Sequence, residues 1–331
     1  MAFDGIFVSG IKSELEKNLL GGRVYKVTEP ERDEIILTIK NNSSTYKLSI
    51  SVNPSLSLCM LTDVNKKSPI NAPTFVMLLR KHIQNGKIVS ITQPNVDRVI
   101  DMEIEHMNEL GDMVSVHLCS EFMGKYSNII LCDNEYNILD SIKRVPSTVS
   151  SVREVLPGRK YFIPDGDKLS LDTLNKNELF ESIRDKKCIL QKAIYTSITG
   201  LSPVIANEIC NNAGLPADLP ATSMSSTEIE KLYNALMNLK SRIDNDEFTF
   251  AIYKDSYSNK PEFSAIPLTS GYYDSVEYES PSQLLSDFYN DKALRNRMTQ
   301  KSFEYRRLTS NLLERETKKL ALQEKQLEST L

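Results

Sequence analysis

The segment that decides the fold reads Glu121-Phe122-Met123-Gly124-Lys125-Tyr126-Ser127-Asn128, and the apolar run Ile129-Ile130-Leu131 follows it directly. The pattern predicts a strand that ends in a tight turn at Gly124, after which another strand begins at once. Glycine lets the backbone take a positive φ or approach another segment closely. A base, an aromatic ring, a hydroxyl and an amide on one turn favour a recognition surface. Ser127 and Asn128 can equally well satisfy their own backbone, and the residues alone leave both interpretations open.

Short β-rich runs lie on both sides of this segment. The first set extends from Arg23 to Met60 and follows a predicted helix at 6–20. A second predicted helix, from Pro73 to Gln84, separates the two sets, with proline at its start and Asn85-Gly86 after its end. The second set covers 87–94, 98–107, 112–122, 127–132 and 136–141. Repeated short strands without helices between them predict antiparallel pairing in a sandwich or sheet pair.

The carboxy-terminal half is predominantly helical. Predicted helices cover 175–187, 188–199, 203–213 and 225–243, and a short β-rich segment follows. From Ser282 onward there is no Pro or Gly, which predicts one long helix. Leu313, Leu320 and Leu327 repeat every seven residues, but polar residues between them make only a weak coiled-coil seam. We therefore expect an α+β protein with domains at 1–170 (antiparallel, β-rich), 171–245 (helical), 246–281 (short β-rich segment) and 282–331 (start of a coiled-coil arm).

Composition sets limits on function. The chain has 331 residues, 40% hydrophobic and 25% charged, which predicts two or three globular domains. Its net charge of −4 excludes uniform basicity, so any RNA contact requires locally concentrated cations. Five scattered cysteines indicate reduced core thiols instead of a disulfide framework or zinc site. No signal peptide is expected before Asp4, and no apolar run approaches the ~18–20 residues of a membrane span.

Catalytic patterns are not found in the sequence. The three histidines have no metal-ligand spacing, and there is neither a Gly-rich phosphate loop nor a Gly-x-Ser-x-Gly elbow. We therefore predict a binding protein without catalytic residues, metal or cofactor. The basic clusters that could meet an anionic partner are Arg80, Lys81 and Lys87; Lys143 and Arg144; and Arg153, Arg159 and Lys160. Solvated surface charge is the better explanation for any one of them unless the fold gathers them.

The pair Asp97-Arg98 is the strongest candidate for recognition of nucleic acid. Arginine offers a planar fork of donors to phosphate or a base edge, and aspartate accepts from base amino groups. We expect the pair on a strand, with the two side chains on opposite faces. A strand-edge turn in which Asp97 caps local amides explains the pair equally well from physics alone.

The stretch from Thr199 to Ile209 lies between two predicted helices and resembles a helix-hairpin-helix. Such hairpins bind phosphate through successive backbone amides, which makes Gly200 and Ser202 candidate contacts. The usual second glycine is missing, and Pro203 has no N–H. Ser202 as N-cap with Pro203 at the first helical position is a complete structural explanation.

Five blocks in the same order resemble the amino-terminal region of the NFACT family, the bacterial RqcH type also called fibronectin-binding protein A. The resemblance extends from Met1 to Leu331. The blocks are Met1-Ala2-Phe3-Asp4-Gly5, Pro73-Thr74-Phe75 with Leu78-Leu79-Arg80-Lys81-His82, Asp97-Arg98, the 121–128 segment, and Ser151-Val152-Arg153-Glu154-Val155-Leu156-Pro157-Gly158. Two departures are Phe122, where the family commonly has isoleucine, and Lys125-Tyr126, where it often has Arg-His.

The resemblance implies a fold similar to the amino-terminal domain of formamidopyrimidine-DNA glycosylases. Their amino-terminal proline nucleophile is replaced by Met1-Ala2-Phe3-Asp4, so glycosylase activity is not expected. It further implies a cytoplasmic factor of ribosome-associated quality control. Such factors bind large ribosomal subunits obstructed by peptidyl-tRNA and recruit tRNA, alanyl-tRNA in bacteria, for template-free carboxy-terminal tailing. A surface adhesin for fibronectin and a protein-interaction scaffold without RNA remain alternatives.

The resemblance also assigns residues to roles. The residues implied in tRNA binding are Asp97, Arg98, Glu121, Met123, Lys125, Tyr126, Ser127 and Asn128. Candidate phosphate contacts are Arg80, Lys81, Arg153, Gly200 and Ser202. Residues 292–331 carry ten Lys/Arg against five Glu, from which we hypothesise an arm that contacts ribosomal RNA. Because family members continue through a coiled coil into a further domain, this chain is expected to be part of a longer protein.

Overall fold

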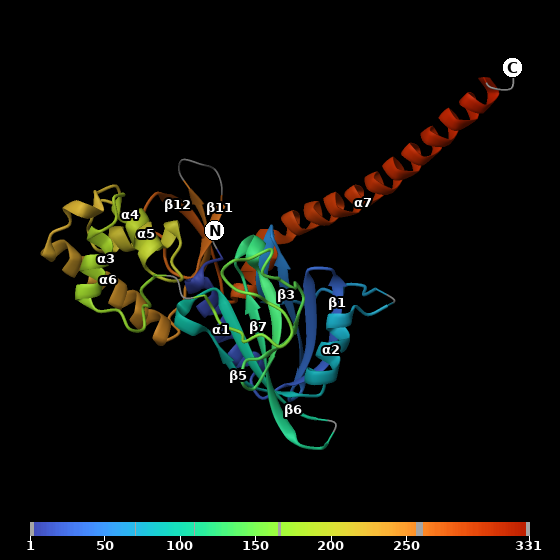
Figure 1. Ribbon diagram of the computed structural model, residues 1–331. Coiled ribbons are helices and arrows are strands. Elements are labelled where there is room, and N and C mark those ends of the chain that lie inside the picture. Colours follow the sequence, from blue (N-terminus) through green and yellow to red (C-terminus); the bar gives the residue numbers. More distant parts are fainter. Residues whose placement is uncertain (1–2, 70, 109, 165–166, 256–260, 329–331) are drawn as a thin grey trace. The chain divides into compact units, whose positions relative to one another are not determined.

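The computed structural model describes residues 3–69, 71–108, 110–164, 167–255 and 261–328 (Figure 1). The chain forms two compact units, Met1–Leu285 and Ser286–Leu331. The predicted division of the first 285 residues into three domains stays a prediction. No described helix combines the length and apolar character needed to cross a membrane.

The first unit contains an antiparallel sheet with nine described strands. Their order is β4-β3-β2-β1-β5-β6-β7-β8-β9, and every pairing is antiparallel, as the short strands predict. The strands are β1 (Arg23–Glu31), β2 (Glu34–Asn41), β3 (Ser44–Asn53), β4 (Leu56–Leu61), β5 (Lys87–Thr92), β6 (Val99–Met107), β7 (Met113–Glu121), β8 (Asn128–Asp133) and β9 (Ile138–Ser141). The predicted sheet pair is therefore one continuous sheet.

A short seam joins the two halves of this sheet. Strands β1 and β5 pair at a single position, Arg23 with Lys87. Backbone bonds of 2.9 Å from Gly21 N to Ile88 O and from Ile88 N to Gly22 O extend the seam. At the other edge of the first half, the Ser57 hydroxyl of β4 lies 2.7 Å from that of Ser127, just before β8. The sheet therefore curves so that its outer strands approach each other.

Two helices pack against the sheet. Helix α1 (Gly5–Leu19) is buried along most of its first three turns, because apolar side chains surround it on nearly all sides. Helix α2 (Thr74–Ile83) buries Phe75, Val76, Leu79 and Ile83, the spacing of one helical face. Each such side chain contributes about 1.5–3 kcal/mol when it leaves water. The predicted helices at 6–20 and 73–84 are thus confirmed, and their apolar faces form the core with the sheet.

The helical region and the small sheet also follow the predicted order. The helices are α3 (Lys176–Arg184), α4 (Leu190–Ser197), α5 (Pro203–Asn212) and α6 (Ser226–Asp244). The second sheet has the order β11-β10-β12 and consists of β10 (Phe250–Asp255), β11 (Pro261–Ser264) and β12 (Tyr272–Tyr278). A complete capping box at Ser225 and Glu228 begins α6, which explains why that helix starts where it does.

Helix α7 (Pro281–Glu328) is the predicted long helix. Its first turn lies in the first unit, where the hydroxyls of Ser280 and Ser282 both donate to the Glu14 carboxylate of α1. In the second unit, Leu313 and Leu320 are 71% and 55% exposed. These two seam positions are thus exposed in this chain, and the coiled-coil arm stays a prediction. The side chains of Lys292, Arg295, Arg297, Lys301 and Lys325 lie outside the described residues.

Candidate functional site

The 121–128 segment folds as predicted. Strand β7 ends at Glu121, the 3₁₀ turn η2 covers Gly124–Tyr126, and β8 begins at Asn128. Gly124 has φ +61°, a conformation that glycine adopts at little cost. Phe122 is buried, with its ring edge-on to Phe3 at 5.4 Å between centroids. The turn is therefore anchored in the core by Phe122, two residues before its glycine.

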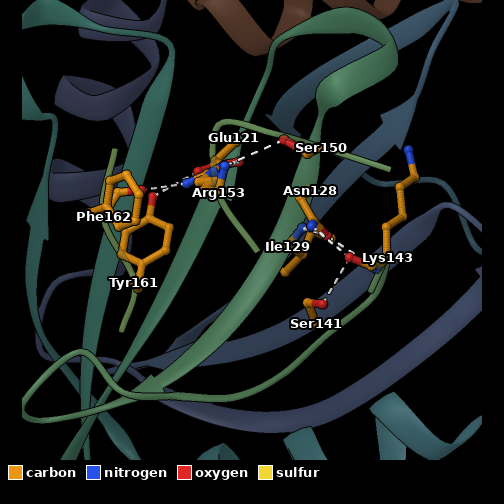
Figure 2. Close-up of polar contacts among 9 residues, drawn as sticks. All are labelled: Glu121, Asn128, Ile129, Ser141, Lys143, Ser150, Arg153, Tyr161 and Phe162. Carbon is orange, nitrogen blue, oxygen red and sulfur yellow. Dashed lines mark hydrogen bonds and ion pairs between the residues drawn. The ribbon is translucent and has the colours of Figure 1, made fainter. Parts of the chain in front are cut away.

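Glu121 supports the turn from within the protein (Figure 2). Its side chain is fully buried, and Arg153 Nη2 donates to its Oε2 at 2.5 Å while Tyr161 OH donates to Oε1 at 3.0 Å. Arg153 also donates from Nη1 to the carbonyl of Phe162 at 2.6 Å. Burial lowers the pKa of Arg153, but the hydrogen bond and charge of Glu121 outweigh it and raise the pKa overall. Glu121 and Arg153 thus tie β7 to the 150–163 segment.

Ser127 and Asn128 also hold the turn in place, Ser127 through the Ser57 hydroxyl at 2.7 Å and Asn128 through backbone groups. Asn128 Nδ2 donates to Lys143 O at 2.8 Å, and its Oδ1 accepts from Ile129 N and Lys143 N at 3.0 and 3.1 Å (Figure 2). Both residues are buried. Of the two interpretations left open above, the structure shows the backbone-satisfying one for Asn128, whereas the Ser127 hydroxyl bonds to the Ser57 side chain.

The outer part of the turn consists of Lys125 and Tyr126. Both side chains are exposed, Tyr126 to 70%. Lys125 Nζ lies 4.7 Å from the centroid of the Tyr126 ring, a cation–π contact. Met123 is half-buried beside them. Among the six predicted residues of this segment, these three are the ones that a ligand can reach.

Asp97-Arg98 occupies a loop and not a strand, which corrects the expectation above. The pair follows the 3₁₀ turn η1 (Pro94–Val96) and precedes β6. Asp97 Oδ1 accepts from the Arg98 backbone N–H at 2.7 Å, and the Asp97 carbonyl accepts from Gln93 Nε2 at 2.7 Å. Both side chains are half-buried. The predicted cap by Asp97 is therefore present, while the Arg98 guanidinium has no acceptor in the described contacts.

Gly200 holds the helical hairpin against the amino terminus. It has φ +80°, and a Cβ there would lie 2.1 Å from Val96 O. Its carbonyl accepts from Gly5 N at 2.8 Å. Ser202 is the N-cap of α5, accepting from Ile205 N at 3.3 Å, and Pro203 occupies the first turn. The purely structural explanation of Ser202 and Pro203 is thus confirmed, and Gly200 is required by close backbone contact.

A cavity of about 430 Å³ brings the pair and the hairpin together. Asp97, Arg98, Gly200 and Ser202 line it, with two residues that the sequence reasoning missed, Asp4 and Lys168. Burial raises the pKa of Asp4 to about 6, although hydrogen bonds from Ser202 and Phe7 act to lower it. Partial burial and then the charge of Arg98 lower the pKa of Lys168. The charge of Asp97 acts on the pKa of Lys168 in the opposite direction, so the cavity holds two cations beside two acidic side chains.

Arg80 and Lys81 lie elsewhere, in the last turn of α2. Arg80 donates from Nε and Nη2 to the carbonyl of Val27 at 3.1 and 3.0 Å, which ties α2 to β1. Lys81 is exposed. Neither lines the cavity at Asp97-Arg98. Of the five predicted phosphate contacts, therefore, Gly200 and Ser202 are the two that line the same cavity as Asp97 and Arg98.

The sequence comparisons are consistent with the resemblance over the whole chain. A family model described as NFACT N-terminal and middle domains matches residues 4–331. The Rqc2 homolog RqcH of Bacillus subtilis (strain 168) is 33% identical over 333 residues, which covers 100% of this chain and 55% of that protein. The chain thus spans about half the length of the curated relatives it matches.

Solved structures give the same picture for the fold. The amino-terminal part of the fibronectin/fibrinogen-binding protein from Streptococcus suis has a TM-score of 0.71 and 30% identity, covering 87% of this chain and 99% of that one. The MutM (Fpg) protein from Thermus thermophilus matches at a TM-score of 0.36 and 11% identity, covering 72% of this chain and 75% of that one. This TM-score is too low to establish a shared fold, so the predicted similarity to the glycosylase fold stays a prediction.

Proposed function

The chain belongs to the NFACT family, and we propose that it is a cytoplasmic ribosome-associated quality control factor. In this role it binds large ribosomal subunits obstructed by peptidyl-tRNA. It recruits tRNA, alanyl-tRNA in a bacterium, so that residues are added to the stalled chain without a template. Peptide-bond chemistry then belongs to the ribosome, and this protein contributes binding and positioning. Its partners are the large subunit, tRNA and ribosomal RNA.

The observation that carries the proposal is the contact between its two predicted tRNA motifs. The backbone N–H of Phe122 donates to the carbonyl of Arg98 at 2.8 Å, and Val99 pairs with Glu121 in the sheet. The Asp97-Arg98 loop therefore adjoins the 121–128 turn, although more than twenty residues separate them. One RNA molecule can contact both.

The two motifs supply complementary chemistry. Arg98 and Lys168 provide cations in the cavity for a backbone phosphate, because guanidinium binds phosphate oxygens through a fork and ammonium as a point charge. Lys125 and Tyr126 provide a cation and an exposed ring, on which an unpaired base can stack. In this proposal Glu121, Arg153, Ser127 and Asn128 act indirectly, by holding the turn in place.

The adhesin alternative has one observation in its favour. The solved relative from Streptococcus suis bears the name fibronectin/fibrinogen-binding protein. The quality-control proposal and the adhesin alternative predict different binding partners. RNA should copurify with the protein in the first case, and purified fibronectin should bind RNA-free protein in the second.

The direct test uses the protein with purified large subunits that carry peptidyl-tRNA and with subunits that lack it. We expect cosedimentation with the first and recruitment of labelled tRNA to the complex. Equal cosedimentation with both kinds of subunit and no recruitment of tRNA would contradict the proposal. Because the chain spans about half of its relatives, weak ribosome binding with intact tRNA binding would assign ribosome affinity to the part of those relatives that this chain does not span.

A further inference from the structure

Three exposed cations lie side by side across the seam of the large sheet. Arg23 on β1 pairs directly with Lys40 on β2 and with Lys87 on β5. Side chains of directly opposite residues emerge on the same face of a sheet, so these three form a row. All three are exposed. We call Lys40, Arg23 and Lys87 the seam row.

The seam row carries an excess of positive charge. Like charges directly opposite on neighbouring strands destabilise a sheet. Arg23 Nη1 donates to the carbonyl of Asn85 at 2.9 Å, a neutral acceptor. Within the described part of the chain, no ion pair joins any of the three to a carboxylate. Glu105 on β6 is the next residue in register after Lys87, so the four positions carry a net charge of +2.

Tyr25 fixes one end of the row. Its ring is 53% exposed, and Lys40 Nζ lies 3.7 Å from its centroid. The ring face attracts the ammonium without neutralising it. Lys40 is therefore held close to Arg23 but keeps its charge available to a ligand.

We propose that the seam row binds successive phosphates of an RNA backbone, at a surface separate from the cavity of Asp97 and Arg98. Neighbouring strands are about 4.8 Å apart, so the row extends over roughly 10 Å, more than one small anion can contact. A polymer with regularly spaced negative charges fits it better. The seam also holds the row rigidly, because backbone bonds from Gly21 and Ile88 join the strands beneath it.

The proposal deepens the RNA-binding function and rests on it. It also explains how a protein of net charge −4 can hold RNA, because the positive charge is concentrated at particular positions. The cavity would select tRNA by local chemistry, and the seam row would add affinity without sequence preference, as phosphate contacts do. No residue of the row lines the cavity, so the two surfaces can be tested one at a time.

The test compares two triple variants of equal charge change, R23Q/K40Q/K87Q and K67Q/K187Q/K192Q. The second set consists of exposed lysines. Binding of a single-stranded 20-mer of uridine and of tRNA is measured between 50 and 200 mM salt. Each lost phosphate contact lowers the slope of log K against log salt by about 0.7 for single strands, so the seam-row variant should lose about 2. The control should keep the slope of the unaltered protein.

A second pair of variants tests the geometry. Tyr25→Phe keeps the ring under Lys40 and should leave RNA affinity unchanged, whereas Tyr25→Leu should lower it about threefold because Lys40 is no longer held in the row. A melting curve for every variant separates loss of binding from loss of fold.

Two results would overturn the proposal. One is an equal salt slope for the two triple variants. The other is unchanged RNA binding in the seam-row variant together with loss of binding to vesicles of anionic lipid, which would assign the row to a membrane surface. Failure of the proposed function looks different, because then the unaltered protein binds neither tRNA nor large subunits.

Discussion

The backbone N–H of Phe122 donates a 2.8 Å hydrogen bond to the carbonyl oxygen of Arg98. This bond continues the β6–β7 ladder past the last strand pair, Val99 with Glu121. As a result the loop that carries Asp97 and the turn that carries Lys125 emerge from the same end of two neighbouring strands. The rigid sheet, and not the loops themselves, sets the spacing between the two groups of polar side chains.

The first prediction concerns the loop. Replacing Asp97 and Arg98 by alanine should abolish tRNA binding while ribosome binding is retained. Both side chains are half-buried with few contacts, so the free energy of unfolding should change by about 0.5 kcal/mol. Filter binding of labelled tRNA and a denaturant titration measure the two effects.

A matched control for this variant is D218A/K192A, which removes the same two charges at exposed positions. It should bind tRNA normally. A large loss of stability in the Asp97/Arg98 variant with intact tRNA binding would show that the pair serves the fold alone.

The second prediction concerns the buried pair of Glu121 and Arg153. Removing one member leaves the other charge buried without a partner, which typically costs about 3–5 kcal/mol. Glu121→Ala and Arg153→Ala should therefore each lower stability by this amount. The double variant should lose much less than the sum, because it leaves no unpaired charge. Urea denaturation of the unaltered protein, the two single variants and the double variant measures the coupling energy. Losses of stability that simply add would contradict the ion pair.

How far the sequence predicts this site can be seen residue by residue. The turn at Gly124 was predictable because alternating apolar residues and one glycine are local signals. The sequence alone places Asp97-Arg98 on a strand, because no local pattern indicates that Asn95 and Val96 take positive φ, a non-helical conformation that turns the chain just before the pair. Glu121 looks available to RNA in the sequence, because its partner Arg153 lies 32 positions away and no local pattern indicates their ion pair. Lys168 reaches the cavity only through the packing of the helical region against the amino terminus.

The third prediction uses the pKa of Asp4, which burial raises to about 6 from 3.8. The folded state then binds this proton more tightly than the unfolded state, so stability falls as pH rises from about 4 to 6. At pH 7 the buried carboxylate costs on the order of 3 kcal/mol. Asp4→Asn keeps the N-cap of α1, because asparagine caps as well as aspartate, and removes the charge.

We therefore expect Asp4→Asn to be more stable than the unaltered protein at pH 7 and equally stable below about pH 4. Thermal unfolding at closely spaced pH values measures the difference. A constant difference between the two proteins across this range would mean that Asp4 does not titrate there.

The fourth prediction concerns Gly200. Both Gly200 and Gly158 have positive φ, +80° and +79°. A Cβ at Gly158 would meet open space. Gly158→Ala should therefore lower the free energy of unfolding only by the roughly 1–2 kcal/mol that a left-handed conformation costs. A Cβ at Gly200 would also collide with Val96 O, so Gly200→Ala should lower the free energy of unfolding by about 1–3 kcal/mol more. Urea denaturation measures both, and equal losses would mean that the hairpin does not contact the 94–98 loop as closely as the structure has it.

The last prediction concerns the basic helix α7. Within its described residues, Lys318 and Lys319 pair with Glu314 and Glu316 at 2.7 and 4.0 Å. Among the side chains that the structure describes, no such pair involves Arg306, Arg307 or Arg315, and all three are exposed. If this helix contacts ribosomal RNA, these arginines release more counterions than the paired lysines do.

Deleting residues 292–331 should therefore flatten the salt dependence of binding to large subunits. The variant R306Q/R307Q/R315Q should reproduce most of that change, lowering the slope by about 2, while K318Q/K319Q should change it much less. Cosedimentation at stepwise salt concentrations measures the slopes. If the slope is the same with and without the helix, the helix makes no RNA contact, and only the role of a spacer remains.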